Sequence, residues 1–342
     1  MFNLNHLSKI LAVSGVCLAT LVGCGQAEEK KTATPAPAST DAKTIAVTAI
    51  VEHPSLDAVR KGLVEELANQ GFKEGENLKV NFQSAQGNTA TAGQIAKQFV
   101  SENPNAIVAI ATPSAQSVVA ATTSIPVVFA AVTDPVEAKL VKSWEASGTN
   151  VTGMSDQLPL DAQIDLIKKI VPNVQNIGYV YSPGEVNSTV VLKELETKLK
   201  PLNINIIAAP AQRTVDIPQA TRSLQGKVDV IYTSLDNNVV SAYEALYQAA
   251  KEIKVPSIAS STETVERGAI AALGVDYTAM GHETGKIVAK ILNGESAGTI
   301  KPMTMPKFDL HINTQAAKEI GLELPADLVK EATKVVDTIG KK

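Results

Sequence analysis

The sequence predicts an α/β protein of two doubly wound domains, each with a parallel sheet, joined by a three-strand hinge and facing each other across a cleft. Apolar runs alternate with amphipathic segments from Lys43 onward, which is the pattern of successive strand–helix units. The two halves follow the same order, because 106–114 corresponds to 228–236 and 125–128 corresponds to 255–258. The length of 342 residues is too great for a single core and suits two domains.

The strands expected in the first half are apolar along most of their length. Such runs are typical of parallel strands, because helices cover both faces of the sheet. The helix after the third strand is expected to have Thr112 as its N-cap and Pro113 at its first position, and Gly71 ends the first helix. We expect strands at 44–51, 78–83, 106–111 and 126–130, and helices at 56–70, 89–101 and 112–121.

The second half repeats this order from about Val174, and the end of the chain departs from it. We expect strands at 176–181, 204–208, 228–233, 255–259 and 269–276, extended chain at 306–312, and helices ending at 200, 224, 253 and 292, followed by a final helix at 325–339. Three segments are expected to cross between the domains and form the hinge: 148–155, 274–277 and 303–308. One domain then contains 44–151 plus about 277–305, and the other contains 152–276 plus about 306–342.

The N-terminus has the features of an export signal. A short start with one positive charge precedes an apolar run at 10–23, which is too short to span a bilayer as a helix. The run ends in Leu-Val-Gly-Cys24, which resembles the processing site of bacterial lipoproteins and implies removal of 1–23 and lipid on the Cys24 sulfur. A simple secretory signal is the alternative. Residues 24–43 contain two prolines and no apolar periodicity, so we expect a flexible tether to a membrane, in the periplasm or at the cell surface.

Composition and charge disfavour several classes of site. The formal net charge is −4 and basic residues do not cluster, which argues against a nucleic-acid partner. The cysteines are Cys17 and Cys24, so the folded part has no disulfide, thiolate zinc site or cysteine nucleophile. His282 and Glu283 lack a second histidine four residues on, and we expect neither a metal nor a cofactor. We find no nucleophile elbow, phosphate loop or dinucleotide motif, so we do not expect an enzyme.

The turn after the strand at 106–111 is a candidate anion site. Free backbone N–H groups and the positive end of the helix dipole point out of a helix N-terminus, and Ser114 adds a hydroxyl in the first turn. In doubly wound sheets, ligands bind at the carboxyl ends of the strands. The turn is therefore predicted to hold the carboxylate of a small ligand. An ordinary strand–helix connection that binds nothing is the alternative.

Short motifs at the expected strand ends occur at 50–57, 85–88, 111–116, 131–135, 148–153, 185–188, 233–237 and 265–269. Over 43–325 they resemble those of ABC-transporter substrate-binding lipoproteins with the type I periplasmic-binding-protein fold, in particular the TrpX-like proteins. The resemblance implies a receptor that captures an amino acid, with an aromatic, tryptophan-like one favoured, and delivers it to a permease and its ATPase. The alternatives are branched-chain amino acids, a sugar or another small solute, and a ligand-sensing module of a membrane receptor. We expect a monomer.

The resemblance also implies a set of ligand contacts, all at strand ends. These residues are Thr112, Ser114, Thr133, Asp134, Asn187, Ser188, Asp236 and Asp276. His53 also follows a strand, and we expect it either to line the cleft or to serve the structure.

An α-amino acid needs one polar clamp for its carboxylate and another for its ammonium. We expect Ser114, Thr133 and the first-turn N–H groups to hold the carboxylate, and Asn187 and Ser188 to complete that clamp from the second domain. Asp236 is predicted to bind the ammonium through a charge-assisted hydrogen bond. The two domains are expected to close over the ligand by hinge bending.

Several of these residues have a structural alternative. A carboxylate just before a helix often caps it, and a polar residue in a loop often only faces water. The alternatives are a helix cap for Asp134 and Asp236, a tie for a crossing strand for Asp276, and a solvated loop for Asn187 and Ser188.

Overall fold

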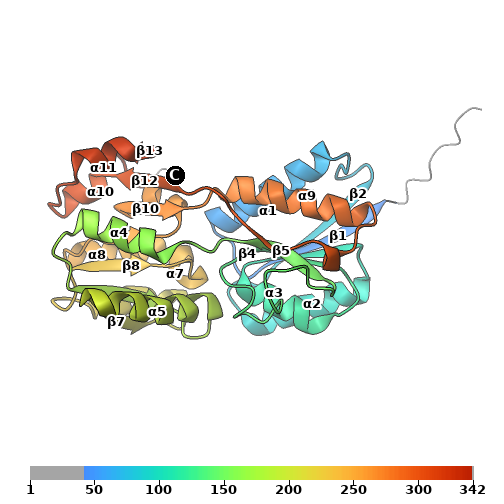
Figure 1. The fold of residues 1–342 in the computed structure, drawn as a ribbon, viewed down its shortest axis with the longest axis horizontal. Helices are drawn as coiled ribbons and strands as arrows, with labels where there is room; N and C mark the ends of the chain where they lie inside the picture. The colour runs from blue at the N-terminus through green and yellow to red at the C-terminus, as the bar shows by residue number, and fades with distance from the viewer. Residues whose placement is uncertain (1–41, 341–342) are drawn as a thin grey trace, which may run out of the picture. The chain divides into compact units, whose positions relative to one another are not determined.

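One sheet gathers the strands of the first half of the chain (Figure 1). The computed structural model describes residues 42–340, so the predicted signal peptide, Cys24 and nearly all of the tether lie outside the described residues. The strands are β1 (Lys43–Ala49), β2 (Leu78–Ser84), β3 (Ala106–Ile110), β4 (Val127–Val132), β5 (Val151–Ser155) and β11 (Met303–Thr304). Their order is β11-β5-β4-β3-β1-β2, and every pair is parallel.

Helices cover both faces of this sheet, so β3 and β4 are buried along their whole length. In Figure 1, α1 (Pro54–Asn69) and α9 (Tyr277–Leu292) lie on one face, and α2 (Thr89–Glu102) and α3 (Thr112–Ala121) lie on the other. The backbones of α1 and α9 approach closely through glycines. A Cβ atom on Gly281 would lie 2.3 Å from the backbone oxygen of Val59 and 2.9 Å from Cα of Gly62.

The second sheet has the same construction with two added strands. Its strands are β6 (Asn176–Tyr181), β7 (Asn205–Pro210), β8 (Val230–Thr233), β9 (Ser257–Ala259), β10 (Ala271–Gly274), β12 (Asp309–Asn313) and β13 (Lys334–Val336). Their order is β13-β12-β10-β9-β8-β6-β7. Only the pairing of β10 with β12 is antiparallel.

Two apolar clusters flank the second sheet. One is shared by α4 (Leu160–Ile170), α5 (Val186–Leu199) and α11 (Ala326–Glu331). The other is shared by α6 (Ile217–Arg222), α7 (Asn237–Ser241), α8 (Tyr243–Glu252) and α10 (Thr314–Glu319). Short 3₁₀ helices occur at η1 (Lys200–Leu202), η2 (Thr214–Asp216), η3 (Thr262–Arg267) and η4 (Ala297–Thr299).

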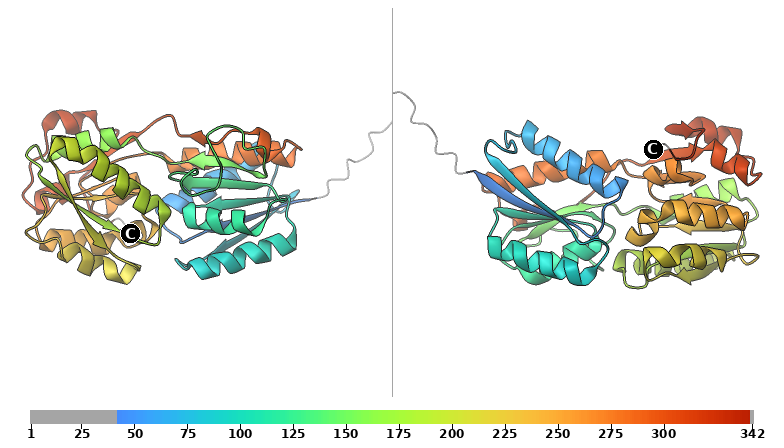
Figure 2. Two further views of the ribbon diagram at one scale, coloured as in Figure 1. Left: turned by 60° about the horizontal axis from the view of Figure 1, so that its bottom comes forward. Right: turned by 180° about the vertical axis from the view of Figure 1, so that it is seen from behind.

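The two sheets repeat one strand order. β2-β1-β3-β4-β5 in the first matches β7-β6-β8-β9-β10 in the second, which confirms the predicted pair of doubly wound α/β units. We call the first sheet with its helices the first lobe, and the second sheet with its helices the second lobe. The chain passes between the lobes at 156–159, 275–276 and 305–308, and Figure 2 shows these connections from two further sides.

The helix predicted to run to 253 is broken near Ala242. The structure has α7 and α8 there, and Ala242 has φ −105° and ψ 29°, outside the helical range. The guanidinium of Arg267 donates to the carbonyl oxygens of Val240 (2.6 Å) and Ser241 (3.1 Å). Carbonyl groups at the end of a helix need partners, and Arg267 supplies two of them from a distant segment. The sequence prediction missed this tertiary contact.

The final helix predicted at 325–339 is wrong in its second half. The helix α11 ends at Glu331, and the chain then forms β13, which pairs with β12. The free edge of β12 offers hydrogen-bond partners that outweigh the helical spacing of the apolar residues. The prediction also had no elements at α4 and α10. In α4, the spacing of Leu160, Ile164 and Ile167 carries the helical signal that was overlooked.

Candidate ligand-binding site

The carboxyl ends of strands from both lobes surround one polar cavity. In the first lobe, Asp156, Thr133, Thr112 and His53 follow β5, β4, β3 and β1, so they form a row along one sheet edge. Strands are about 4.8 Å apart, so the ends of β5 and β3 are separated by roughly 10 Å. The cavity is lined by His53, Ser55, Leu56, Thr112, Ala131, Thr133, Asp156, Asn187, Leu235, Asn237, Val240, Ser261 and Tyr277.

Unpartnered polar atoms mark this cavity as a binding site. His53 Nδ1, Thr112 Oγ1, Asp156 Oδ1 and Asn187 Oδ1 are buried and have no hydrogen-bond partner, and all four residues line the cavity. Ser114, two residues after Thr112 in the same turn, is fully buried and its Oγ also has no partner. Buried polar groups are nearly always hydrogen-bonded. Each buried group without a hydrogen bond lowers the stability of the folded protein by about 1–3 kcal/mol. Such a concentration at one cavity indicates a polar ligand.

The start of α3 provides the anion-binding end. The structure corrects the predicted cap: the helix begins at Thr112 and the N-cap is Ala111, without a side-chain cap. Ala111 has φ 73° and ψ 154°, and Ala131 after the neighbouring strand has φ 53°. Such conformations cost a non-glycine residue about 1–3 kcal/mol and cluster at ligand sites. The helix N-terminus, with its free N–H groups, therefore lies where Thr112 lines the cavity.

Asp156 provides a carboxylate on the other side of Thr133. The residue is 3% exposed, and its Oδ2 accepts a hydrogen bond from the hydroxyl of Tyr277 at 3.1 Å. Burial raises the pKa of Asp156 to about 6. Among residues 42–340, no basic side chain forms an ion pair with it. A buried carboxylate without a counter-charge can pair with a cationic ligand group.

Asn187 faces the cavity from the second lobe. Its Nδ2 donates to Glu185 Oε2 at 2.9 Å and to the carbonyl oxygen of Leu235 at 3.0 Å. Both amide hydrogens are therefore engaged, and only the unpartnered Oδ1 remains. Asn187 thus contributes an acceptor to the same cavity as Asp156.

An apolar pocket adjoins the polar cavity and shares Thr133 and Leu235 with it. Half of its lining residues are apolar or aromatic and come from the second lobe and the first crossing, and the carboxylates of Asp134 and Glu194 lie among them. The full lining is Thr133, Asp134, Gln157, Leu158, Leu160, Val190, Val191, Glu194, Tyr232, Ser234, Leu235 and Ser260. A polar cavity beside an apolar pocket suits a ligand with a charged head and an apolar side chain.

Direct contacts join the lobes at the wall of the cavity. Ser55 Oγ lies 3.0 Å from Ser261 Oγ and donates to Glu263 Oε2 at 3.3 Å. Ser261 Oγ also donates to Glu263 Oε2 at 3.0 Å. His53 is 8% exposed, and burial, followed by the charge of Arg267 in the second lobe, lowers its pKa to about 3. The ring of His53 is therefore neutral at physiological pH.

The structure brings some of the residues selected from the sequence to this site and places others elsewhere. His53, Thr112, Thr133 and Asn187 line the polar cavity, Ser114 lies just behind it, and Asp134 lines the apolar pocket. The Asp134 side chain also caps the turn that follows it, since Oδ1 accepts from the N–H groups of Val136 and Glu137.

Three of the selected residues do not face either space. Asp236 accepts hydrogen bonds from Ser182 N (2.6 Å), Ser182 Oγ (2.9 Å) and Val239 N (3.0 Å), so its side chain ties β6 to the start of α7. Ser188 is fully buried, and its carbonyl oxygen accepts from the hydroxyl of Tyr179. Asp276 is exposed and caps α9 through the N–H of Ala279. Asp236 has its structural alternative, a helix cap, whereas Asp276 caps α9 rather than tying down a crossing strand, and Ser188 is buried rather than in a solvated loop.

The sequence interpretation missed several residues of the cavity. Asp156 directly follows the buried strand β5, so the rule of polar residues at strand ends could have found it. Ser261 follows the buried strand β9 and carries the same signal, whereas Ser55 and Tyr277 lie in the first turns of α1 and α9.

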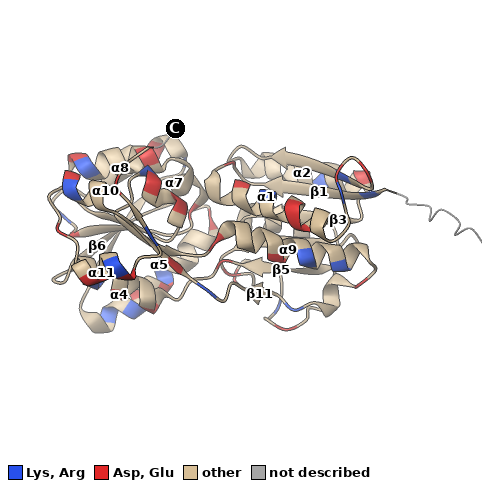
Figure 3. Ribbon diagram, turned by 90° about the horizontal axis from the view of Figure 1, so that it is seen from above, with Lys and Arg blue, Asp and Glu red and all other residues tan. Residues whose placement is uncertain are grey.

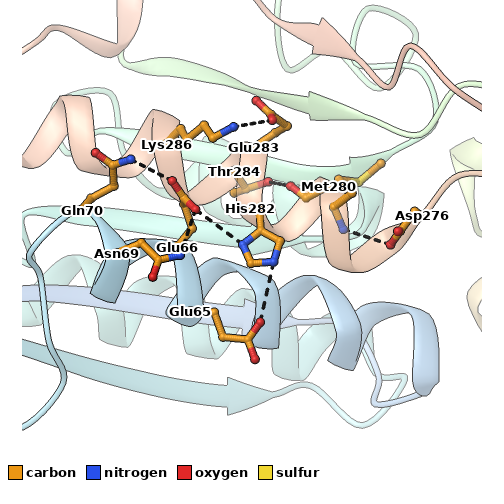
Figure 4. A network of polar contacts seen from close by, with 11 residues as sticks. Glu65, Glu66, Asn69, Gln70, Asp276, Met280, His282, Glu283, Thr284 and Lys286 are labelled. Carbon is orange, nitrogen blue, oxygen red and sulfur yellow. Dashed lines mark hydrogen bonds and ion pairs between the residues drawn. The ribbon is translucent and has the colours of Figure 1, made fainter.

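Outside the cleft, His282 and Glu283, which the sequence analysis considered as metal ligands, form polar contacts with neighbouring side chains. Figure 4 shows His282 of α9 between Glu65 and Glu66 of α1, at 3.7 and 3.6 Å, and Glu283 in an ion pair with Lys286. No group of three or more His, Cys, Asp or Glu residues within 42–340 could hold a metal ion.

Figure 3 shows acidic and basic residues mixed along the helices on the side viewed. Within the described range, every helix is too short or too polar to cross a membrane.

Comparison with known proteins places this site in context. A family model described as ABC transporter substrate binding protein matches residues 44–336. A tyrosine-binding protein of Clostridioides difficile (strain R20291) is 39% identical over 333 residues, covering 95% of this chain and 94% of the relative.

Two similar solved structures differ in whether a ligand is bound. An ABC domain from Streptococcus pneumonia in complex with L-Trp is 33% identical with a TM-score of 0.83, covering 86% of this chain and 100% of that chain. The ligand-free, open structure of a Clostridium difficile substrate binding protein with adhesive properties is 39% identical with a TM-score of 0.66, covering 86% and 99%.

Proposed function

The chain belongs to the family of ABC transporter substrate-binding proteins, and from this premise we propose that it captures an aromatic α-amino acid between its lobes. Members of the family are solute-binding receptors that bind small molecules outside the cytoplasm and deliver them to an ABC permease. The two-lobed α/β architecture agrees with the type I periplasmic-binding-protein fold. The observation that carries the proposal is the set of unpartnered polar atoms at the cavity between the lobes.

The polar cavity fits the head of an amino acid. The carboxylate binds at the N-terminus of α3, where Thr112, Ser114 and the free N–H groups lie. The ammonium binds on the other side of Thr133, between Asp156 Oδ1 and Asn187 Oδ1. This assignment moves the ammonium partner from Asp236 to Asp156, because the oxygens of Asp236 already accept hydrogen bonds within the second lobe.

The apolar pocket fits an aromatic side chain. Leu158 comes from the first crossing, and Leu160, Val190 and Tyr232 come from the second lobe. Burial of an aromatic ring against these side chains is the main source of affinity for such a ligand. The relatives named for tyrosine and solved with L-Trp support an aromatic ligand over a branched-chain amino acid or a sugar.

The arrangement of the lobes supports capture by closure. The open, ligand-free relative has the higher identity but the lower TM-score, whereas the relative with L-Trp has a TM-score of 0.83. The contact between Ser55 and Ser261 joins the lobes here at 3.0 Å. A ligand shifts such an equilibrium toward the closed form only through contacts that it gains there, and Asp156 and Asn187 are such contacts.

The N-terminal segment supports attachment to a membrane. Cleavage before Cys24 and lipid on its sulfur leave residues 24–43 as a tether, so that the receptor stays close to its permease. One chain supplies both lobes of the cavity, which supports a receptor that acts as a monomer.

A thermal-shift screen tests the proposed ligand. A soluble form that starts after Cys24 is heated with each of the twenty amino acids and with common sugars. Tyrosine and tryptophan are expected to raise the melting temperature most, because a ligand that binds only the folded state stabilises it by mass action. Titration calorimetry should then give dissociation constants of about 1–10 µM or lower. A larger shift with a sugar or a non-aromatic amino acid contradicts the proposal.

A pair of variants tests whether the aromatic ring of the ligand binds in the apolar pocket. Leu158→Glu places a carboxylate in the apolar pocket and should weaken tyrosine binding at least about tenfold. Leu202→Glu makes the same change at a leucine that is 43% exposed in η1, and it should leave the affinity unchanged. Equal affinities for the two variants would mean that the ring does not bind in this pocket.

A further inference from the structure

Glu185 is a buried carboxylate behind the ligand cavity rather than in its wall. It is 7% exposed, stands at the N-cap of α5, and is absent from the residues that line the cavity. Its Oε2 accepts from Asn187 Nδ2 at 2.9 Å, from Asn237 N at 3.0 Å and from Asn237 Nδ2 at 2.6 Å. Both asparagines line the cavity, so a single oxygen atom of Glu185 is hydrogen-bonded to two of the lining residues.

This contact fixes which end of the Asn187 amide faces the ligand. An amide group can rotate by half a turn and exchange its oxygen for its N–H₂ group. Here Nδ2 is held by Glu185 and by the carbonyl oxygen of Leu235, so a rotated amide would place its oxygen against two acceptors. The unpartnered Oδ1 is therefore the only group that Asn187 can offer to the cavity.

The carboxylate also serves the structure, because its Oε2 accepts from the backbone N–H of Asn237 at the start of α7. Burial, together with the charge of the neighbouring Asp236, raises the pKa of Glu185 to about 8. These two effects disfavour the ionised state of Glu185. Glu185 provides an acceptor oxygen that reaches two asparagines. These hydrogen bonds do not require the side chain to be charged.

We propose that Glu185 is a positioning residue: it occupies the amide hydrogens of Asn187, presents Asn187 Oδ1 to the ammonium of the ligand, and so selects α-amino acids over analogues without an amine. The proposal rests on the proposed function, because it assumes that an ammonium binds beside Asn187. It assigns to Glu185 no contact with the ligand itself.

Two conservative variants separate the reach of the side chain from its charge. Glu185→Gln keeps an acceptor oxygen at the same distance without a charge, and Glu185→Asp keeps the charge but is one methylene too short. The readout is the ratio of two affinities, measured for tyrosine and 3-(4-hydroxyphenyl)propanoate and for tryptophan and 3-indolepropanoate. The wild-type ratio is expected to be about a hundredfold or more in favour of the amino acid.

The expected result is a ratio within about threefold of wild type for Glu185→Gln and at least about tenfold lower for Glu185→Asp. Binding of the amine-free analogues should stay within about twofold in both, which also reports that the variants are folded. In an Asn187→Ala background, Glu185→Asp should have no further effect on the ratio, because coupled residues are not additive.

Three outcomes overturn the proposal: loss of the ratio in Glu185→Gln, an unchanged ratio in Glu185→Asp, or a full effect of Glu185→Asp in the Asn187→Ala background. The glutamine variant alone decides if the aspartate variant does not fold. A wild-type protein that binds neither amino acid refutes the proposed function instead, and the two failures are therefore distinguishable.

Discussion

Replacing Asp156 with asparagine should weaken ligand binding and stabilise the ligand-free protein at the same time. The raised pKa of Asp156, from 3.8 to about 6, means that the ionised carboxylate is disfavoured in the folded state. This difference corresponds to about 3 kcal/mol when the group is ionised. Asparagine keeps an acceptor oxygen for the Tyr277 hydroxyl and carries no charge, so most of this cost disappears.

The sign of the pH dependence follows from the same values. Between about pH 4 and pH 6 the folded protein holds the Asp156 proton more tightly than the unfolded chain does. The contribution of Asp156 to the free energy of unfolding therefore falls as the pH rises through this window, and it stays low above pH 6. Ligand binding has the opposite dependence, because the ammonium requires the ionised form, and affinity should fall below about pH 6.

The experiment compares wild type and Asp156→Asn by thermal unfolding and titration calorimetry between pH 5 and pH 8. At pH 7.5 the ligand-free variant should melt at least about 2 °C higher than wild type. Its affinity for tyrosine should be about 10–150-fold lower, the range for loss of a hydrogen bond to a charged group. The affinity of the variant should also lose its dependence on pH near 6.

A matched variant at the other buried aspartate provides the control. Asp236→Asn removes a carboxylate whose oxygens bind Ser182 and Val239 and do not face the cavity, so the affinity should change less than about threefold. If Asp236→Asn abolishes binding while Asp156→Asn leaves it intact, the ammonium binds at Asp236 and the assignment to Asp156 is refuted.

Three further changes test other parts of the molecule. Gly281→Ala should lower the free energy of unfolding in urea by about 2 kcal/mol or more, because its Cβ would lie 2.3 Å from a backbone oxygen of α1. Gly93→Ala in α2, where a Cβ has open space, should instead be neutral or stabilise by up to about 1 kcal/mol, and equal losses for the two glycines would contradict the close packing. Ser55→Ala removes a hydroxyl that joins the lobes, so stopped-flow measurements should show ligand dissociation several-fold faster with little change in association. An unchanged dissociation rate would mean that this contact does not hold the closed form. Cys24→Ser should move the protein from the membrane fraction to the soluble fraction, and retention at the membrane would argue against a lipid on Cys24.

The local pattern of the sequence was sufficient for the architecture. The apolar runs that became β3 and β4 and the helical spacing in α1 and α9 are properties of short segments, so they can be recognised without any tertiary contact. The repeated order of the two halves then predicted the paired sheets, and the resemblance to the family, supported by the rule that ligands bind at strand ends, selected Thr112, Thr133 and Asn187.

Contacts between distant segments limited the remaining predictions. Arg267 ends α7 from a position far along the chain, and the edge of β12 converts the predicted end of the last helix into β13. The sequence around α7 does not contain Arg267, and the sequence around β13 does not contain β12. Helical spacing alone therefore could not give the end of either helix.

The sequence determined that polar side chains gather where the strands of two sheets end, and only the tertiary structure decided which of them are free to bind. Asp156 and Asp236 both follow buried strands, and their chemistry is the same. Ser182 and the start of α7 already satisfy the oxygens of Asp236, whereas one oxygen of Asp156 has no partner within the protein. A carboxylate can bind a ligand only with hydrogen-bonding capacity that the fold has left unused, and that depends on every neighbour in space.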